Sequence, residues 1–129
     1  MKYRQQIIDL IDETAKAYTK STRAAKDTNF SSGCLYEAPD GRQCAVGRLC
    51  TNALELERNC GGKSAGDNAT LDLMKFKPEY KWIGELPRLI RAKLLNELQE
   101  IHDDRANWKD DGLSPLGEQA IERLKGWVG

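Results

Sequence analysis

The sequence predicts an α+β fold: a predominantly helical single domain in which one β-hairpin packs on four or so helices. Two observations support this fold class. Apolar residues recur every three or four positions in several long segments, as on the buried face of a helix. One short stretch, at about residues 34–45, carries the turn residues of a hairpin. The chain has 129 residues, the size of one compact domain, which we expect to cover residues 1–129.

The longest apolar pattern predicts a central helix over residues 84–102. Its apolar positions are Leu86, Ile90, Leu94, Leu98 and Ile101. Leu95 widens this stripe, so we expect the helix to pack against neighbours on two sides. Pro87 suits the first helical turn, where the amide proton that it lacks would have no partner within the helix.

Two further helices are predicted near the ends of the chain. The first covers residues 3–25, and its apolar face comprises Tyr3, Ile7, Ile11, Ala15 and Tyr18. The last begins at Ser114 and Pro115, a residue pair typical of a helix N-terminus. Its inward stripe is expected to comprise Leu116, Ala120, Ile121, Leu124 and Trp127.

The hairpin is predicted from Pro39, Asp40 and Gly41, which are residue types that favour a tight turn. Its strands would cover residues 34–37 and 42–45, and a second helix is expected over residues 46–60. Residues 59–68 are rich in glycine and polar side chains, which indicates a loop. Residues 70–76 fit a strand or a short helix, residues 78–87 a turn or a brief helix, and residues 103–113 a loop.

Three segments resemble small uncharacterised proteins encoded by bacteriophages and bacterial genomes. The segments are CLYEAPDGRQCAVGRL at 34–49, LLNELQEIHDDRANW at 94–108 and LSPLGEQAI at 113–121. The resemblance implies a phage or prophage accessory protein that acts by binding host machinery. It carries over no catalytic residue.

The charge composition excludes a protein that is held to nucleic acid or to a membrane by its net charge. Twenty basic residues balance twenty acidic ones, so any such partner would need a local patch. No apolar run is long enough to span a membrane, and the charged N-terminal segment does not resemble a secretory signal. We therefore expect a cytoplasmic protein with no membrane partner, located in the host cytoplasm if it is phage-encoded.

The cysteines Cys34, Cys44, Cys50 and Cys60 are spaced ten, six and ten positions apart. Structural zinc sites more often draw their cysteines from pairs about two to four residues apart. We therefore expect packed or free thiols and no cofactor. A zinc site formed by these four residues and a disulfide both stay open.

His102 is the only histidine, and Asp103 and Asp104 follow it directly. A metal-dependent hydrolase needs several histidines and carboxylates around its ions, which a single histidine does not provide. We expect His102 to lie at the edge of the apolar stripe of the central helix. An enzyme that uses His102 stays open as an alternative.

The segment between Lys75 and Lys93 is the main candidate for a binding site, because it combines cations with aromatic rings. The cations are Lys75, Lys77, Lys81, Arg88, Arg91 and Lys93, and the aromatic residues are Phe76, Tyr80 and Trp82. Tyrosine, tryptophan and arginine dominate protein-binding hot spots. Aromatic rings beside cations also bind nucleotides and single-stranded nucleic acid. Partner or ligand binding is therefore expected at Tyr80, Lys81, Trp82, Arg88 and Arg91.

The predicted function is non-catalytic binding, and so modulation, of a host protein. Binding of small nucleotides or nucleic acid by the same residues is the first alternative, and an enzymatic activity that uses His102 is the second. A further interpretation places Phe76 and Trp82 in the core beneath solvated lysines. The identity of the partner and the presence of a homodimer stay open.

Overall fold

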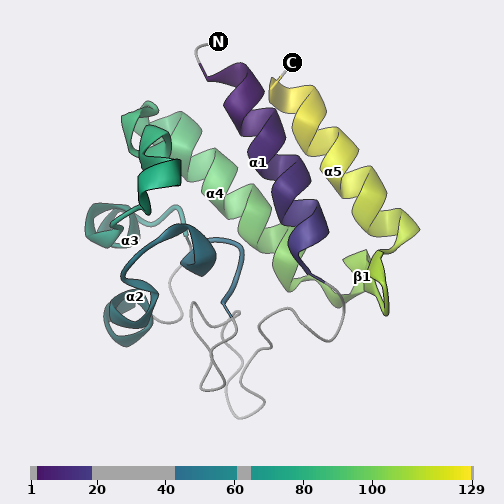
Figure 1. The fold of residues 1–129 in the computed structure, drawn as a ribbon, viewed down its shortest axis with the longest axis horizontal. Helices are drawn as coiled ribbons and strands as arrows, with labels where there is room; N and C mark the ends of the chain where they lie inside the picture. Colours follow the sequence, from purple (N-terminus) through teal and green to yellow (C-terminus); the bar gives the residue numbers. More distant parts are fainter. Residues whose placement is uncertain (1–2, 19–42, 61–64, 129) are drawn as a thin grey trace.

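The computed structural model describes residues 3–18, 43–60 and 65–128 of the chain (Figure 1). Within these residues the fold is mostly helical with a single two-stranded antiparallel hairpin, which confirms the predicted α+β class. The α-helices are α1 (Arg4–Ala17), α2 (Ala53–Cys60), α3 (Asn68–Leu73), α4 (Arg88–Asp103) and α5 (Pro115–Val128). The 3₁₀ helices are η1 (Gly47–Leu49), η2 (Pro78–Glu85) and η3 (Arg105–Asn107), and the strands are β1 (Trp108–Lys109) and β2 (Gly112–Leu113).

The long helices α1, α4 and α5 build most of the core. Helices α1 and α5 lie side by side and antiparallel, and α4 crosses behind α1 (Figure 1). The start of α1 and the end of α5 therefore lie at the same end of the molecule, opposite the hairpin. The buried apolar residues are Ile7, Leu10 and Ile11 on α1, Leu94, Leu95, Leu98 and Ile101 on α4, and Ala120, Ile121, Leu124 and Val128 on α5.

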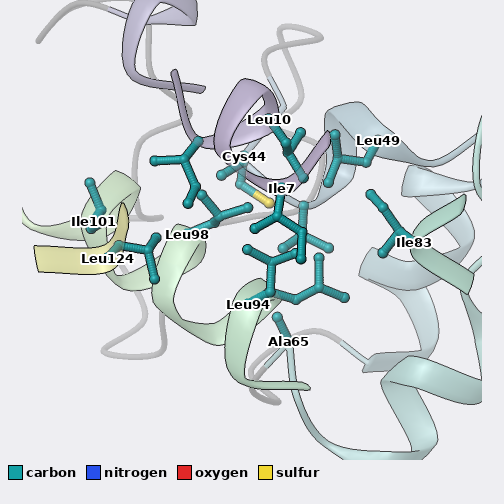
Figure 2. Packing of buried hydrophobic residues seen from close by; sticks show 14 of the residues in the cluster. Ile7, Leu10, Cys44, Leu49, Ala65, Ile83, Leu94, Leu98, Ile101 and Leu124 are labelled. Atoms are coloured by element: carbon teal, nitrogen blue, oxygen red, sulfur yellow. The ribbon is translucent and has the colours of Figure 1, made fainter. Parts of the chain in front are cut away.

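The centre of the core joins α1 to α4. Figure 2 shows Ile7, Leu94 and Leu98 converging, with the sulfur of Cys44 beside them. Each fully buried leucine or isoleucine stabilises the fold by about 1.5–3 kcal/mol. The adjacent residues Leu94 and Leu95 are both completely buried, so α4 is enclosed on two sides, as its wide apolar stripe predicts.

Helix α1 ends earlier than predicted. Tyr18 has extended backbone angles, with φ −133° and ψ 156°, so Ala17 is the last helical residue. The Tyr18 hydroxyl donates a hydrogen bond to the carbonyl oxygen of Gln43 at 2.9 Å. This bond ties the end of α1 to the segment before η1. The rest of the predicted helix, residues 19–25, lies outside the described residues.

The hairpin that the structure describes is not the one predicted at residues 34–45, most of which lies outside the described residues. Within the predicted second strand, Cys44 and Ala45 do not form a strand. The described hairpin instead pairs Trp108 with Leu113 and Lys109 with Gly112, where a loop was predicted. Gly112 has φ +146°, a conformation that side chains with a Cβ rarely adopt, so this glycine permits the tight turn.

The helix predicted over residues 46–60 is interrupted at Cys50. There the chain is extended and forms an antiparallel bridge with Phe76. The amide of Thr51 donates to the carbonyl of Lys75 at 2.7 Å, and the amide of Lys77 donates to the carbonyl of Leu49 at 2.9 Å. These bonds to a distant segment replace the helical ones, and the helix resumes only at α2.

The segments around α3 and η2 combine the alternatives that the sequence left open. Within residues 70–76 the chain is helical as far as Leu73 and then extended at Phe76. The brief helix expected within residues 78–87 is confirmed as η2. Ile83 is completely buried and attaches η2 to the core.

Helix α5 begins as predicted. The Ser114 hydroxyl accepts a hydrogen bond from the amide of Gly117 at 3.2 Å, which satisfies one of the free amides of the first turn. A Cβ on Gly117 would lie 2.1 Å from the carbonyl oxygen of Asn107. The close approach of α5 to η3 therefore requires glycine at this position.

Candidate functional site

The predicted binding residues lie on two consecutive elements, η2 and the first turn of α4. Leu86, which is 5% exposed, anchors the junction between the two elements in the core. We call this region the η2–α4 surface, and it comprises Tyr80, Lys81, Trp82, Arg88, Leu89 and Arg91. The structure thus brings all five predicted residues to one part of the molecule.

Tyr80 belongs to a polar network that spans three elements. Its hydroxyl donates to the carboxylate of Glu13 on α1 and accepts from Nη1 of Arg48 on η1 at 3.2 Å. The same Nη1 lies 2.7 Å from Oε1 of Glu13, and Nη2 of Arg48 donates to the Thr14 hydroxyl at 2.9 Å. The Arg48 guanidinium lies 5.9 Å from the centre of the Tyr80 ring. Tyr80 is therefore held by internal contacts.

This network shifts the pKa values of its acids in opposite directions. Burial raises the pKa of Tyr80, and the hydrogen bond to Glu13 raises it further. Burial alone would raise the pKa of Glu13, but the hydrogen bonds from Tyr80 and Arg48 together lower it below its usual value. Glu13 is therefore held as a carboxylate and Tyr80 as a neutral phenol.

Trp82 is half-buried and stacks on Tyr3 at the start of α1. The two ring centres are 5.9 Å apart, and the planes are inclined by 30°. The Tyr3 hydroxyl also donates to the carboxylate of Glu85 at the end of η2. Tyr3 and Trp82 both pack against the edge of the core, so Trp82 has a structural role in addition to any role in binding.

The cations of the surface differ in how firmly they are held. Nη2 of Arg88 lies 2.6 Å from Oδ1 of Asp72 in an exposed ion pair. Nη1 of Arg91 donates to the carbonyl of Gly84 at 3.0 Å and so holds the end of η2. Lys81 is exposed and forms no ion pair with another described residue.

Leu89 is the residue of this surface that was not among the predicted binding residues. Its side chain is 86% exposed, more than that of Leu54 at 47% and of Leu116 at 57%. Leu116 was predicted on the inward stripe of the last helix, and this prediction is wrong. The available signal was its position, because Leu89 falls outside the apolar stripe of the central helix. A leucine off the buried face points to solvent.

His102 is fully buried, not at the edge of the apolar stripe as predicted. Its Nδ1 lies 3.0 Å from Oδ1 of Asp103, and its ring meets the Tyr18 ring edge-on, with centres 4.7 Å apart. The indole nitrogen of Trp108 donates to the carbonyls of Ile101 and His102 at 3.1 Å each. These contacts make His102 part of a polar cluster inside the core.

Cys44 lies in the same buried region. Its sulfur accepts a hydrogen bond from the amide of Gly47 at 3.2 Å. Burial raises the pKa of the Cys44 thiol to about 12, although hydrogen bonds from the Gly47 backbone and Gln99 oppose the shift. Nucleophilic cysteines need a lowered pKa, so the structure favours a packed, protonated thiol here.

The other described cysteines, Cys50 and Cys60, are buried as well. Both are free thiols, as is Cys44, and burial raises the pKa of Cys50 to about 12. Among the residues that the structure describes, no three histidine, cysteine or acidic side chains gather as a metal site would require. The fourth cysteine of the zinc alternative, Cys34, lies outside them.

Two surface grooves flank helix α5, and neither is lined by His102 or Cys44. The first, of about 370 Å³, lies between α4 and α5 and mixes acidic residues with Lys93, Arg123 and Trp127. The second, of about 440 Å³, lies between α1, the hairpin and the start of α5. Both are separate from the η2–α4 surface.

Comparison with protein-family models, curated proteins and solved structures gives no match for this chain. The phage resemblance therefore receives no support from these comparisons. In the ranges that the structure describes, every helix is too short or too polar to cross a membrane.

Proposed function

We propose that this chain is a non-catalytic binding protein that contacts an acidic protein partner through the η2–α4 surface. The proposal places it in the cytoplasm. Under the resemblance to phage and prophage proteins, the partner is a protein of the bacterial host, whose activity binding would modulate.

The observation that carries the proposal is the exposure of Leu89 next to Arg88, on a helix turn whose two arginines are already held in place. Arg88 is fixed by Asp72, and Arg91 is fixed by the carbonyl of Gly84. Arginine side chains that are ordered before binding lose less conformational entropy when a partner arrives. Burial of the exposed Leu89 side chain by a partner would add apolar stabilisation beside the charge of Arg88.

The charge of the surface favours an acidic partner. Lys75, Lys77 and Lys81 extend the cations of η2 and α4. Glu79 and Glu85 are the opposing acids within this stretch, and the Glu85 carboxylate already accepts a bond from Tyr3. Complementary charge accelerates association and suppresses wrong partners.

Nucleotide or nucleic-acid binding by the same residues is the second candidate. It would use the faces of Tyr80 and Trp82 as stacking platforms for bases. However, the guanidinium of Arg48 lies over the Tyr80 ring, and Tyr3 stacks on Trp82. Because a ring face of each residue is already occupied, the geometry favours the protein partner.

Affinity capture from a bacterial lysate with paired variants tests the proposal. Leu89→Lys should abolish recovery of the partner, whereas Leu116→Lys on α5, the matched exposed leucine, should leave it unchanged. Equal recovery with both variants would show that the η2–α4 surface is not the binding site.

Thermal-shift measurements test the nucleotide alternative. A nucleotide or oligonucleotide present at a hundred times its dissociation constant stabilises its protein by about 2.7 kcal/mol. A shift that is lost on Arg88→Ala would favour this alternative over a protein partner.

A further inference from the structure

The groove between α1, the hairpin and α5 has an apolar floor. Its volume is about 440 Å³, a size that accommodates a few side chains or a small ligand. Ala15 from α1, Leu113 from β2 and Ile121 from α5 contribute apolar surface to it. The floor is thus built from three separate elements that pack on one another.

The rim of this groove is acidic. Asp12, Asp111, Glu118 and Glu122 line it, and Lys16 is the one basic residue among the described lining residues. We call this region the acidic groove. Its carboxylates come from α1, the hairpin turn and α5, so they surround the floor.

Three of the four acids of the rim, Asp111, Glu118 and Glu122, remain available to a ligand. The side chains of Asp111 and Glu122 are 82% and 74% exposed, and their lysine partners lie 3.7 Å away. Exposed pairs of this kind contribute little to stability, so a bound cation can replace the lysine. Asp12 is more firmly held, at 2.8 Å from Lys125. Glu118 forms no ion pair with another described residue.

We infer that the acidic groove binds a basic segment of a second protein, one that carries lysine or arginine next to an apolar side chain. The floor covers the apolar group and the methylene stem of the cation, and the rim accepts its charged head. Electrostatic complementarity of this kind determines specificity and association rate. The inference goes beyond the proposed function, because the groove shares no residue with the η2–α4 surface.

A second copy of this chain suits the groove less well than a foreign segment. The groove has a volume of about 440 Å³, which accommodates a few side chains, whereas the η2–α4 surface comprises six residues. A narrow basic segment of a partner therefore fits the acidic groove better than a second copy does.

The test uses a synthetic helical peptide of leucine, alanine and lysine, titrated calorimetrically into the full chain at low salt. The peptide should bind, and a version with glutamate in place of lysine should not. The double change Asp111→Asn and Glu118→Gln should weaken binding about three- to tenfold, as expected for two exposed ion pairs. Lys16→Gln should strengthen binding about twofold, because it removes the opposing charge.

The matched control is the double change Glu97→Gln and Glu100→Gln, which alters the net charge equally but lies in the other groove. It should leave the affinity within about twofold of the wild-type value. Equal weakening by both double variants would overturn the inference, because the peptide would then respond to net charge alone. Failure of the lysine peptide to bind would overturn it too.

Sedimentation equilibrium at the same low salt decides between the two occupants. If the chain is a monomer both with and without the Asp111→Asn and Glu118→Gln changes, the result supports a foreign segment as the occupant of the acidic groove. An oligomer that dissociates on the double change Asp111→Asn and Glu118→Gln would overturn the inference and assign the groove to a second copy. Because Leu89 is intact in every one of these variants, failure here leaves the proposed function standing.

Discussion

Nη1 of Arg48 lies 2.7 Å from the Glu13 carboxylate, and this ion pair joins α1 to η1 next to the candidate binding surface. The Arg48 side chain is 16% exposed and also bonds Thr14 and Tyr80. Arg48→Met should therefore destabilise the protein by about 2–3 kcal/mol, because it removes the hydrogen bonds that this mostly buried side chain makes with Glu13, Thr14 and Tyr80. Urea unfolding measures this. Arg88→Met removes only an exposed ion pair and should cost at most about 1 kcal/mol. Equal losses of stability for the two variants would contradict the structural role of the Arg48 contacts.

The Glu13 pair should also make stability depend on pH. The pKa of Glu13 is lowered in the folded protein from its ordinary value of 4.5. Its contribution is therefore complete above that value and is lost as the pH falls through the lower folded pKa. Because the side chain is half-exposed, the contribution is at most about 1 kcal/mol. Unfolding at pH 7 and pH 3 should show that the difference between the wild type and Glu13→Gln shrinks at the lower pH. A difference that grows at pH 3 would contradict a lowered pKa of Glu13 in the folded protein.

Two leucines of α4 should differ sharply in their effect on stability. Leu94 is completely buried, whereas Leu89 is 86% exposed. Leu94→Ala should cost about 2–5 kcal/mol, through lost burial and the cavity left behind. Leu89→Ala should change the free energy of unfolding by less than about 0.5 kcal/mol. Chemical denaturation tests both. A large loss for Leu89→Ala would show that this leucine serves folding and is not kept free for a partner.

Two glycines of α5 provide a second matched pair. A Cβ on Gly117 would lie 2.1 Å from the Asn107 carbonyl oxygen, whereas one on Gly126 meets nothing within 4 Å. Gly117→Ala should therefore lower the melting temperature, since α5 and η3 must move apart. Gly126→Ala should raise stability by up to about 1 kcal/mol, because alanine favours the helix. Calorimetry compares them, and stabilisation by both would refute the close packing.

The described thiols should react slowly with labelling reagents. Burial raises the pKa of both Cys44 and Cys50 to about 12, and thiolates, not thiols, are the reactive form. In a Cys34→Ser variant, Ellman's reagent at pH 8 should find no rapidly reacting thiol until urea is added. A fast-reacting Cys44 would favour the alternative function, an enzyme that uses His102.

Local sequence signals predicted the elements whose structure depends on their own residues. The cap at Ser114, the brief helix η2 and the enclosure of α4 on two sides followed from capping residues and apolar spacing. The break at Cys50 could not be predicted, because it depends on pairing with Phe76, a residue far along the chain. The hairpin at β1 and β2 had a signal in Asp111 and Gly112, but its strands are too short to show alternation.

The candidate site was predictable in its location but not in its chemistry. Composition identified Tyr80, Trp82 and Arg88, because aromatic residues and cations gather there. It could not show that Tyr80 is bound by Glu13 and Arg48, since those partners lie on other elements. Likewise, the rim of the acidic groove is assembled from α1, the hairpin turn and α5 only in the folded chain.

The antiparallel arrangement of α1 and α5 determines where a tag can be attached and where the chain can be permuted. Since the first turn of α1 and the last turn of α5 lie at the same end, away from the hairpin, an affinity tag or fluorophore attached near either helix end stays clear of the acidic groove. A short glycine-rich linker between the two helix ends would permit circular permutation, with new ends opened in the turn before Gly112.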